Sequence, residues 1–286
     1  MSGTEQAKQK TGAAPTLGDL RAEIDRIDAS MHALLMERGE IIGELIKVKR
    51  TAESGAAFRP AREVSMMRRL VERHRGILPL DTVESIWRVI IATFTFVQAP
   101  YSVHADFSAG DAPVRDSARF HFGFTVPLSA HLGAAAVVAA VARSKGDLGL
   151  VPAIAVAGSG AWWTALEDEN APKIIARLPF VERGDHPASL PLFVVSRPIA
   201  ADGAINEVQT WSIKVAGWSA AAARSISAIA EIIASPHGAF DGAALLVSIA
   251  PGGSLDHLVK ALIAAGASVR STALVGGHAT RYTVGA

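Results

Sequence analysis

The sequence contains no cysteine. This absence excludes a disulfide framework, a thiolate zinc site and a cysteine nucleophile, and it fits a reducing compartment. An excess of one charge is also lacking, because the formal net charge is only +1 at pH 7. The composition therefore indicates neither a nucleic acid nor an anionic membrane surface as a partner.

Long uninterrupted hydrophobic runs are missing as well, although 50% of the residues are hydrophobic. The longest apolar stretch, residues 132–160, is interrupted by Arg143, Lys145 and Asp147, so no uncharged segment is long enough to span a bilayer. Residues 1–15 are polar and lack the apolar core of a signal peptide, so we expect a disordered tail. These features predict a soluble, cytoplasmic protein.

The composition changes at two places along the chain. Up to about residue 100 the sequence is rich in Arg and Glu with helical spacing, and beyond it Ala, Gly and Val form short apolar runs. A second change falls at residues 199–206, where small residues read as a linker. We therefore predict a multidomain α plus α/β fold with a tail over residues 1–15, a helical domain over 16–103, an α/β region over 111–198 and an α+β region over 206–286.

The first predicted helix is unusually long. Thr16 and Asp19 form a capping box, and apolar residues at helical spacing continue to about Arg50 without a proline. Such a helix is about 50 Å long at ~1.5 Å per residue. It cannot bury its apolar stripe against two shorter helices, so we expect it to pack against a second chain.

Two shorter helices are predicted to follow. Pro60 suits the first turn of one that ends near Gly76. The other is expected to begin at Asp81, with Glu84 as its capping partner. It carries one apolar stripe of seven side chains: Val83, Ile86, Trp87, Ile90, Ile91, Phe94 and Val97.

The rest of the chain alternates between strand and helix patterns. Strands are predicted over residues 148–156, 173–178, 192–196, 210–216, 243–249, 268–274 and 280–284. Helices are predicted over residues 134–142, 161–169, 220–234 and 255–265. This alternation indicates α/β architecture, with a βαββαβ-like order after residue 206.

Several polar side chains interrupt the helical region: Arg21, Arg38, Lys49, Arg62, Glu63 and Gln98. Arg38 and Lys49 are separated by about 16 Å of helical rise on nearly one face, so both could reach one small anion. Arg21 lies about 25 Å from Arg38 along the axis and about 100° round the helix. If all these cations serve one ligand, Arg21 must come from a partner chain.

The pair Leu20-Arg21 and three longer segments carry a specific resemblance. The runs LLMERGEIIGELIKVK (residues 34–49), FRPAREVSMMRRL (58–70) and IWRVIIATFTFVQ (86–98) resemble the bacterial AroQ-type chorismate mutase in order and spacing. The resemblance covers about residues 16–100. It implies an intertwined homodimer of three-helix protomers with shared active sites. It also implies an isomerase of the shikimate pathway that converts the dianion chorismate to prephenate, on the way to phenylalanine and tyrosine, without a cofactor.

The resemblance implies that positively charged side chains bind the two substrate carboxylates. By position, Arg38 and the partner's Arg21 would bind the carboxylates, and Arg62 would help to orient these contacts. Where the family commonly has a serine that contacts a carboxylate, this sequence has Phe94. Loss of that hydrogen bond is expected to weaken binding by about 1–2 kcal/mol.

The resemblance also implies contacts at the reacting centre. Lys49 and Gln98 would contact the ether oxygen of the breaking bond, and Glu63 would bind the ring hydroxyl. With Arg38, these are the predicted catalytic residues. A pericyclic rearrangement requires positioning of the substrate and donors aimed at the ether oxygen, but no nucleophile, metal or proton transfer. A glutamine at residue 98, rather than a carboxylic acid, predicts a broad pH profile.

The second half of the chain resembles parts of the prephenate dehydratases. Residues 144–166 and 189–198 are similar to the end of the dehydratase catalytic lobe. Where that family has a catalytic Thr-Arg-Phe motif, this sequence has Pro191, Leu192 and Phe193. We therefore interpret the region as a degenerate remnant without dehydratase activity. Residues 206–286 resemble the ACT regulatory domain but lack its phenylalanine-binding motifs.

Alternatives to a chorismate mutase with a non-catalytic second half remain. An isochorismate–pyruvate lyase would use the same helical fold, and a pseudoenzyme would use the helical dimer only to present its second half to a partner. A bifunctional dehydratase is a further alternative. No metal is predicted, because the histidines lack metal-ligand spacing: His121, His131, His186, His237, His257 and His278.

Overall fold

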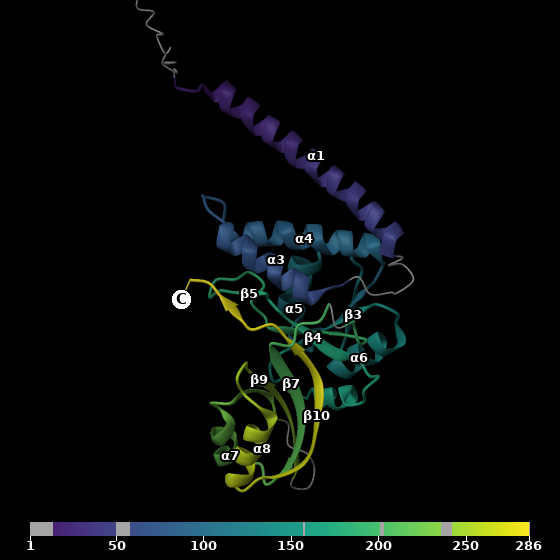
Figure 1. Cartoon of the computed structure of the whole chain (residues 1–286), viewed down its shortest axis with the longest axis vertical. Helices are drawn as coiled ribbons and strands as arrows, with labels where there is room; N and C mark the ends of the chain where they lie inside the picture. The colour runs from purple at the N-terminus through teal and green to yellow at the C-terminus, as the bar shows by residue number, and fades with distance from the viewer. Residues whose placement is uncertain (1–13, 50–57, 157, 201–202, 236–241, 286) are drawn as a thin grey trace, which may run out of the picture. The chain divides into compact units, whose positions relative to one another are not determined.

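The computed structural model describes residues 14–49, 58–156, 158–200, 203–235 and 242–285 (Figure 1). The chain divides into two compact units, residues 1–49 and residues 50–286. The predicted tail falls almost entirely outside the described residues. Within the described residues, no helix has both the length and the apolar content needed to cross a membrane.

The first unit contains one long helix, α1 (Leu17–Lys49). Its predicted capping box is confirmed: the Thr16 amide donates to Asp19 Oδ2 at 2.9 Å, and the Asp19 amide donates to Thr16 Oγ1 at 3.2 Å. Many of its large apolar side chains are exposed: Leu17, Leu20, Ile24, Ile27, Met31, Leu34, Leu35, Met36, Ile41 and Val48. The predicted apolar stripe is therefore present and unburied.

The second unit is built on a nine-stranded mixed sheet with the order β2-β1-β3-β6-β4-β10-β7-β9-β8. The strands are β1 (Val103–Asp106), β2 (Leu128–His131), β3 (Leu148–Pro152), β4 (Lys173–Leu178), β6 (Leu192–Ser196), β7 (Val208–Ala216), β8 (Ala230–Ala234), β9 (Gly242–Ile249) and β10 (Ser268–His278). A separate pair joins β5 (Val181–Glu182) to β11 (Tyr282–Thr283). One sheet thus includes strands from both sides of the predicted linker.

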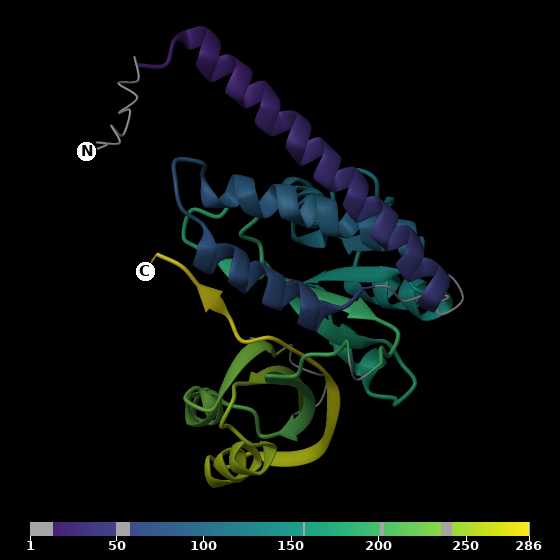
Figure 2. The same ribbon diagram turned by 45° about the horizontal axis from the view of Figure 1, so that its top comes forward.

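Helices surround this sheet in two groups (Figures 1 and 2). The first group is α3 (Pro60–Arg73), α4 (Leu80–Gln98), α5 (Asp111–Phe122) and α6 (Ala134–Arg143), and the second is α7 (Ala220–Ile226) and α8 (Leu255–Ala264). The described residues of this unit also form two 3-10 turns, η1 (Phe107–Ala109) and η2 (Trp162–Leu166). The predicted helix over residues 161–169 is therefore only a short 3-10 turn.

Helices α3 and α4 share one hydrophobic core with α5 and the sheet. Val64 and Met67 on α3 and Ile91 on α4 are buried in the same cluster as Val114 on α5 and Leu150 on β3. These two helices therefore belong to the compact unit that contains the sheet.

The predicted βαββαβ order is confirmed as β7-α7-β8-β9-α8-β10. Its four strands lie in the order β10-β7-β9-β8, as in a ferredoxin-like unit. The predicted helix over residues 220–234 is wrong after Ile226, because Ala230–Ala234 forms β8 and pairs antiparallel with β9. Pairing with a neighbouring strand outweighs the helical preference of an Ala-rich segment.

The start of α4 also differs from the prediction. The helix begins at Leu80 with Pro79 at its N-cap, and no side chain caps it. Glu84 is buried instead, on a face that continues through Arg88, Ile91 and Thr95. Members of the predicted apolar stripe lie outside this face: Ile86 and Val97 are exposed.

Candidate functional site

The predicted site residues are distributed over both units. Arg21, Arg38 and Lys49 lie on α1, and Arg21 is exposed. The side chain of Lys49 falls outside the described part of the chain. Because α1 runs unbroken from Leu17 to Lys49, the axial separation of about 25 Å between Arg21 and Arg38 applies to one continuous helix.

The four remaining positions lie in the second unit. Phe94 and Gln98 occupy the last turns of α4, both half-buried, and Gln98 Nε2 donates to the Phe94 carbonyl at 3.0 Å. Arg62 and Glu63 are neighbours in the first turn of α3. Arg62 is exposed, whereas Glu63 is only 3% exposed. These two adjacent residues therefore point to different environments.

Glu63 is held in a buried ion pair with Arg88 of α4. Arg88 Nη1 donates to Glu63 Oε2 at 2.5 Å, and Arg88 Nη2 donates to the carbonyl oxygen of His121 at 3.2 Å. The guanidinium also lies 4.9 Å from the centre of the Phe180 ring. Burial raises the pKa of the Glu63 carboxyl, and the charge of Arg88 opposes that rise.

A second buried pair lies beside the first. The amide of Ala188 donates to His186 Nδ1 at 2.9 Å, so the ring proton is on Nε2, which faces Glu84 Oε2 at 3.4 Å. The His121 ring stacks on His186 with a centroid distance of 6.4 Å, and burial lowers the pKa of His121 well below its ordinary value. We call Glu63, Glu84, Arg88, His121 and His186 the buried polar cluster.

Sequence reasoning misses most of this cluster. It does not single out Arg88, and it places Glu84 in a cap. One signal is present: residues 84, 88, 91 and 95 repeat at the spacing of a helix face, and two of them are charged. Their partners on α3 and α5 cannot be read from that spacing.

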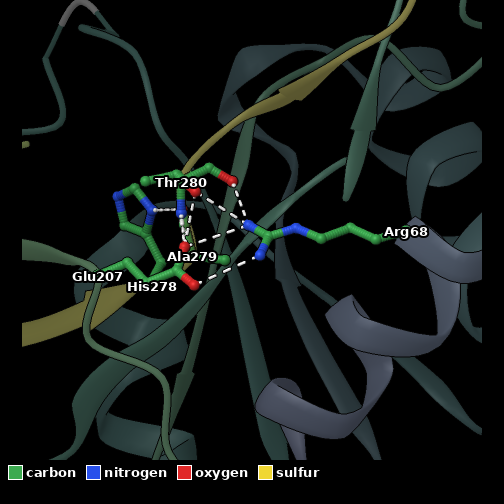
Figure 3. A network of polar contacts seen from close by, with 5 residues as sticks. All are labelled: Arg68, Glu207, His278, Ala279 and Thr280. Carbon is green, nitrogen blue, oxygen red and sulfur yellow. Dashed lines mark hydrogen bonds and ion pairs between the residues drawn. The ribbon is translucent and has the colours of Figure 1, made fainter. Parts of the chain in front are cut away.

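A polar network anchors α3 to the βαββαβ unit (Figure 3). Arg68 donates to the Glu207 carboxylate at 3.3 and 3.1 Å, to Thr280 Oγ1 at 2.9 Å and to the Thr280 carbonyl at 3.2 Å. The amide and hydroxyl of Thr280 also donate to Glu207, at 2.8 and 2.6 Å. Hydrogen bonds from Arg68, with those from Thr280, lower the pKa of Glu207 to about 2.

A polar chain lies on the outer strands of the sheet. His104 Nε2 is 3.1 Å from Asp147 Oδ2, and His104 Nδ1 is 3.0 Å from His131 Nε2. A carboxylate only accepts, so His104 donates to Asp147 through Nε2, and its Nδ1 shares a second hydrogen bond with His131 Nε2. Among the described residues, no group of three or more His, Asp or Glu side chains is arranged to hold a metal ion.

Comparison with known proteins identifies one segment of the chain. Residues 20–99 match the family model described as chorismate mutase type II. A bifunctional chorismate mutase/prephenate dehydratase of Neisseria gonorrhoeae is 34% identical over 83 residues, which are 29% of this chain and 22% of that relative. The match to the chorismate mutase type II family falls on α1, α3 and α4, and the chain spans less than a quarter of the relative's length.

Two solved structures show a more distant likeness. One is described as GqqA, a novel type of quorum quenching acylase, with a TM-score of 0.41, 14% identity, and coverage of 62% of this chain and 94% of that chain. The other is a prephenate dehydratase from Streptococcus mutans, with a TM-score of 0.35, 10% identity, and coverage of 63% and 99%. At these scores, neither likeness supports an inference about function.

Proposed function

We propose that this chain is a chorismate mutase, an isomerase that converts chorismate to prephenate in aromatic amino acid biosynthesis. The observation that carries the proposal is the chorismate mutase type II segment at residues 20–99. That segment contains all seven predicted substrate contacts, from Arg21 to Gln98. A cytoplasmic location and the absence of a cofactor are parts of the same proposal.

The proposed mechanism is positioning combined with electrostatic stabilisation. Arg38, Arg62 and the partner's Arg21 bind the two carboxylates, because planar guanidinium groups suit that geometry. They hold the flexible side chain of the substrate over its ring, which removes much of the entropic barrier. Lys49 and Gln98 donate to the ether oxygen as it gains negative charge, and one such donor is worth about 3 kcal/mol.

The proposal includes a homodimer. The exposed apolar stripe of α1 has the spacing of a packing face, and Ile24 in its middle is 57% exposed. Arg21 and Arg38 lie on one continuous helix, too far apart for one small ligand. A second copy of the chain that covers the stripe would also supply Arg21 to the site.

We further propose that the second half has no dehydratase activity. Leu192 and Phe193, which stand at the position of the dehydratase motif, are fully buried in β6. They offer neither a hydroxyl nor a guanidinium to a substrate. The βαββαβ unit is proposed to be ACT-like, with a role in assembly or regulation, and its ferredoxin-like strand order supports that relationship.

Purified full-length protein tests the proposal directly. With chorismate we expect prephenate, and Lys49→Ala is expected to lower kcat at least a hundredfold. Lys47→Ala is a matched control, since Lys47 is exposed and contacts only Glu44 among the described ion pairs. Equal activity of wild type and Lys49→Ala would favour a pseudoenzyme or a background reaction.

Two further substrates separate the alternatives. Salicylate formed from isochorismate, without turnover of chorismate, would establish a lyase in place of the mutase. Phenylpyruvate formed from prephenate would show that the second half is a working dehydratase. Absence of all three products would reject the catalytic proposal.

A further inference from the structure

We infer that Glu63 does not contact the substrate, and that Arg88 holds it inside the second unit, where the pair joins α3 to α4. The part of this inference that concerns the substrate rests on the proposed mutase function. The resemblance implies that Glu63 binds the ring hydroxyl of the substrate. The inference changes this expectation: the site recognises its substrate without the Glu63 carboxylate.

The burial of the ion pair is the main argument. Glu63 is 3% exposed and Arg88 is 0% exposed, and Nη1 and Oε2 are 2.5 Å apart. These contacts lie within one compact unit, so they do not depend on where α1 lies. A carboxylate that binds a ligand must be reachable by it, and this one is enclosed between α3, α4 and α5.

Releasing Glu63 to a ligand would be strongly unfavourable. Arg88 would keep only the neutral carbonyl of His121 as an acceptor among its described hydrogen bonds. A buried guanidinium without its counter-ion is among the most destabilising arrangements in a folded protein. The ion pair between Glu63 and Arg88 therefore stays intact when substrate binds. Glu63 stabilises the packing of α3 against α4 and does not contact the substrate.

The neighbouring residue shows which side of α3 is available. Arg62 is exposed, and consecutive residues on a helix point about 100° apart. Arg62 and Glu63 therefore point in different directions, with the cation toward solvent and the carboxylate toward the core. On α3, only Arg62 then remains to contact the substrate, through one of the substrate carboxylates.

The test compares two substrates, chorismate and its analogue that lacks the ring hydroxyl. The readout is the ratio of their kcat/KM values in wild type and in Glu63→Met, whose side chain cannot replace the hydrogen bond of a carboxylate. We expect the ratio to change less than threefold, because the thioether replaces a group that the substrate never touches. A site that hydrogen-bonds the hydroxyl through Glu63 would lose at least tenfold of its discrimination in the variant, and that result would overturn the inference.

Stability provides an independent readout. Glu63→Gln and Arg88→Met should each lower Tm by several degrees, and the double variant should lose clearly less than the two single losses added together. Glu72→Gln, at an exposed position of the same helix, should leave Tm unchanged. Additive losses would reject the pairing of Glu63 with Arg88.

The two readouts keep the proposals apart. If wild type converts neither substrate, the mutase proposal fails, while the Tm cycle still decides the role of Arg88. If Glu63→Met does not fold, the substrate ratio is measured in the double variant Glu63→Met/Arg88→Met, which removes both charges of the buried pair.

Discussion

Arg68 on α3 forms an ion pair with Glu207, 139 residues further along the chain. Glu207 lies just before β7, and Thr280, which bonds to both side chains, lies just after β10 (Figure 3). The pair therefore joins a helix of the mutase-like segment to both ends of the βαββαβ unit. These contacts connect that unit directly to the helix that carries Arg62.

Removal of Arg68 should weaken this junction. We expect Arg68→Ala to lower the free energy of unfolding by about 1 kcal/mol, since the hydrogen bonds are charged but partly exposed to solvent. Urea titration measures the loss, and Arg69→Ala, at an exposed neighbouring position, is the control. In a double-mutant cycle with Glu207→Gln, a coupling near zero would contradict the role of this ion pair.

A buried histidine makes the stability of the second unit depend on pH. His278 is 2% exposed, its Nδ1 donates to the Ala279 carbonyl at 2.8 Å, and burial lowers its pKa to about 4. The hydrogen bond to the Ala279 carbonyl and the charge of Glu231 favour the protonated ring and oppose this shift, whereas the charges of Arg177 and Arg281 favour the neutral ring.

Because the folded-state pKa is depressed, the unfolded chain binds the proton more readily. The contribution of His278 is therefore present above pH 6.5 and is lost as the pH falls toward 4, by up to about 3 kcal/mol. His278→Asn keeps a donor but does not titrate, so its Tm should fall less between pH 6.5 and 4. His257→Asn, at an exposed position, should retain the slope of the wild type. Equal slopes in all three proteins would refute the assignment.

The sequence alone is sufficient where structure depends on local pattern. The capping box at Thr16 and the unbroken spacing that follows predict α1 almost to the residue. The helix predicted over residues 220–234 fails because local spacing does not show that Glu231 pairs with Ser248 on β9. Several elements are not predicted at all: β1 and β2, with four residues each, β5, with two, and the 12-residue helix α5.

For the candidate site, too, the sequence predicts local features but not contacts between distant residues. The types and order of the cations on the helices can be read from the sequence, and residues 20–99 do match the chorismate mutase type II family. The environment of Glu63 cannot be predicted from the sequence. It depends on Arg88, 25 residues away, and on the carbonyl of His121, 33 residues from Arg88. Burial of a charged side chain is a property of the packed elements around it.

Gly276 joins the two parts of the large sheet. It is the residue at which β10 pairs with Ile174 of β4, and its φ is +137°. A Cβ at this position would collide with the backbone oxygen of Ile174. Gly276→Ala should therefore cost at least about 2 kcal/mol of stability through strain and lost pairing.

The control for this substitution is Gly252→Ala. Gly252 also has a positive φ, +86°, but a Cβ added there would have no atom within 4 Å. It reports the cost of the backbone conformation alone, about 1 kcal/mol. Equal losses in the two variants, measured by chemical denaturation, would show that close contact with β4 is unimportant.

The exposed stripe of α1 predicts how the chain associates. Ile24→Glu places a charge in the middle of the stripe, and we expect it to shift the protein toward monomer in sedimentation. Ala29→Glu, about 140° away around the helix, should leave association unchanged. If the wild type is a monomer with full activity, the shared-site proposal fails at once.

Complementation between two inactive variants tests the shared site itself. Arg21→Ala and Arg38→Ala should each abolish most activity, because each removes one cation from every site. In a mixed dimer, one site receives Arg38 from one chain and Arg21 from the other, so it is complete, and the second site lacks both. Random exchange of subunits in an equal mixture should therefore restore about a quarter of the wild-type sites in a two-fold dimer. A site built from a single chain would gain nothing from mixing, since neither variant could repair the other.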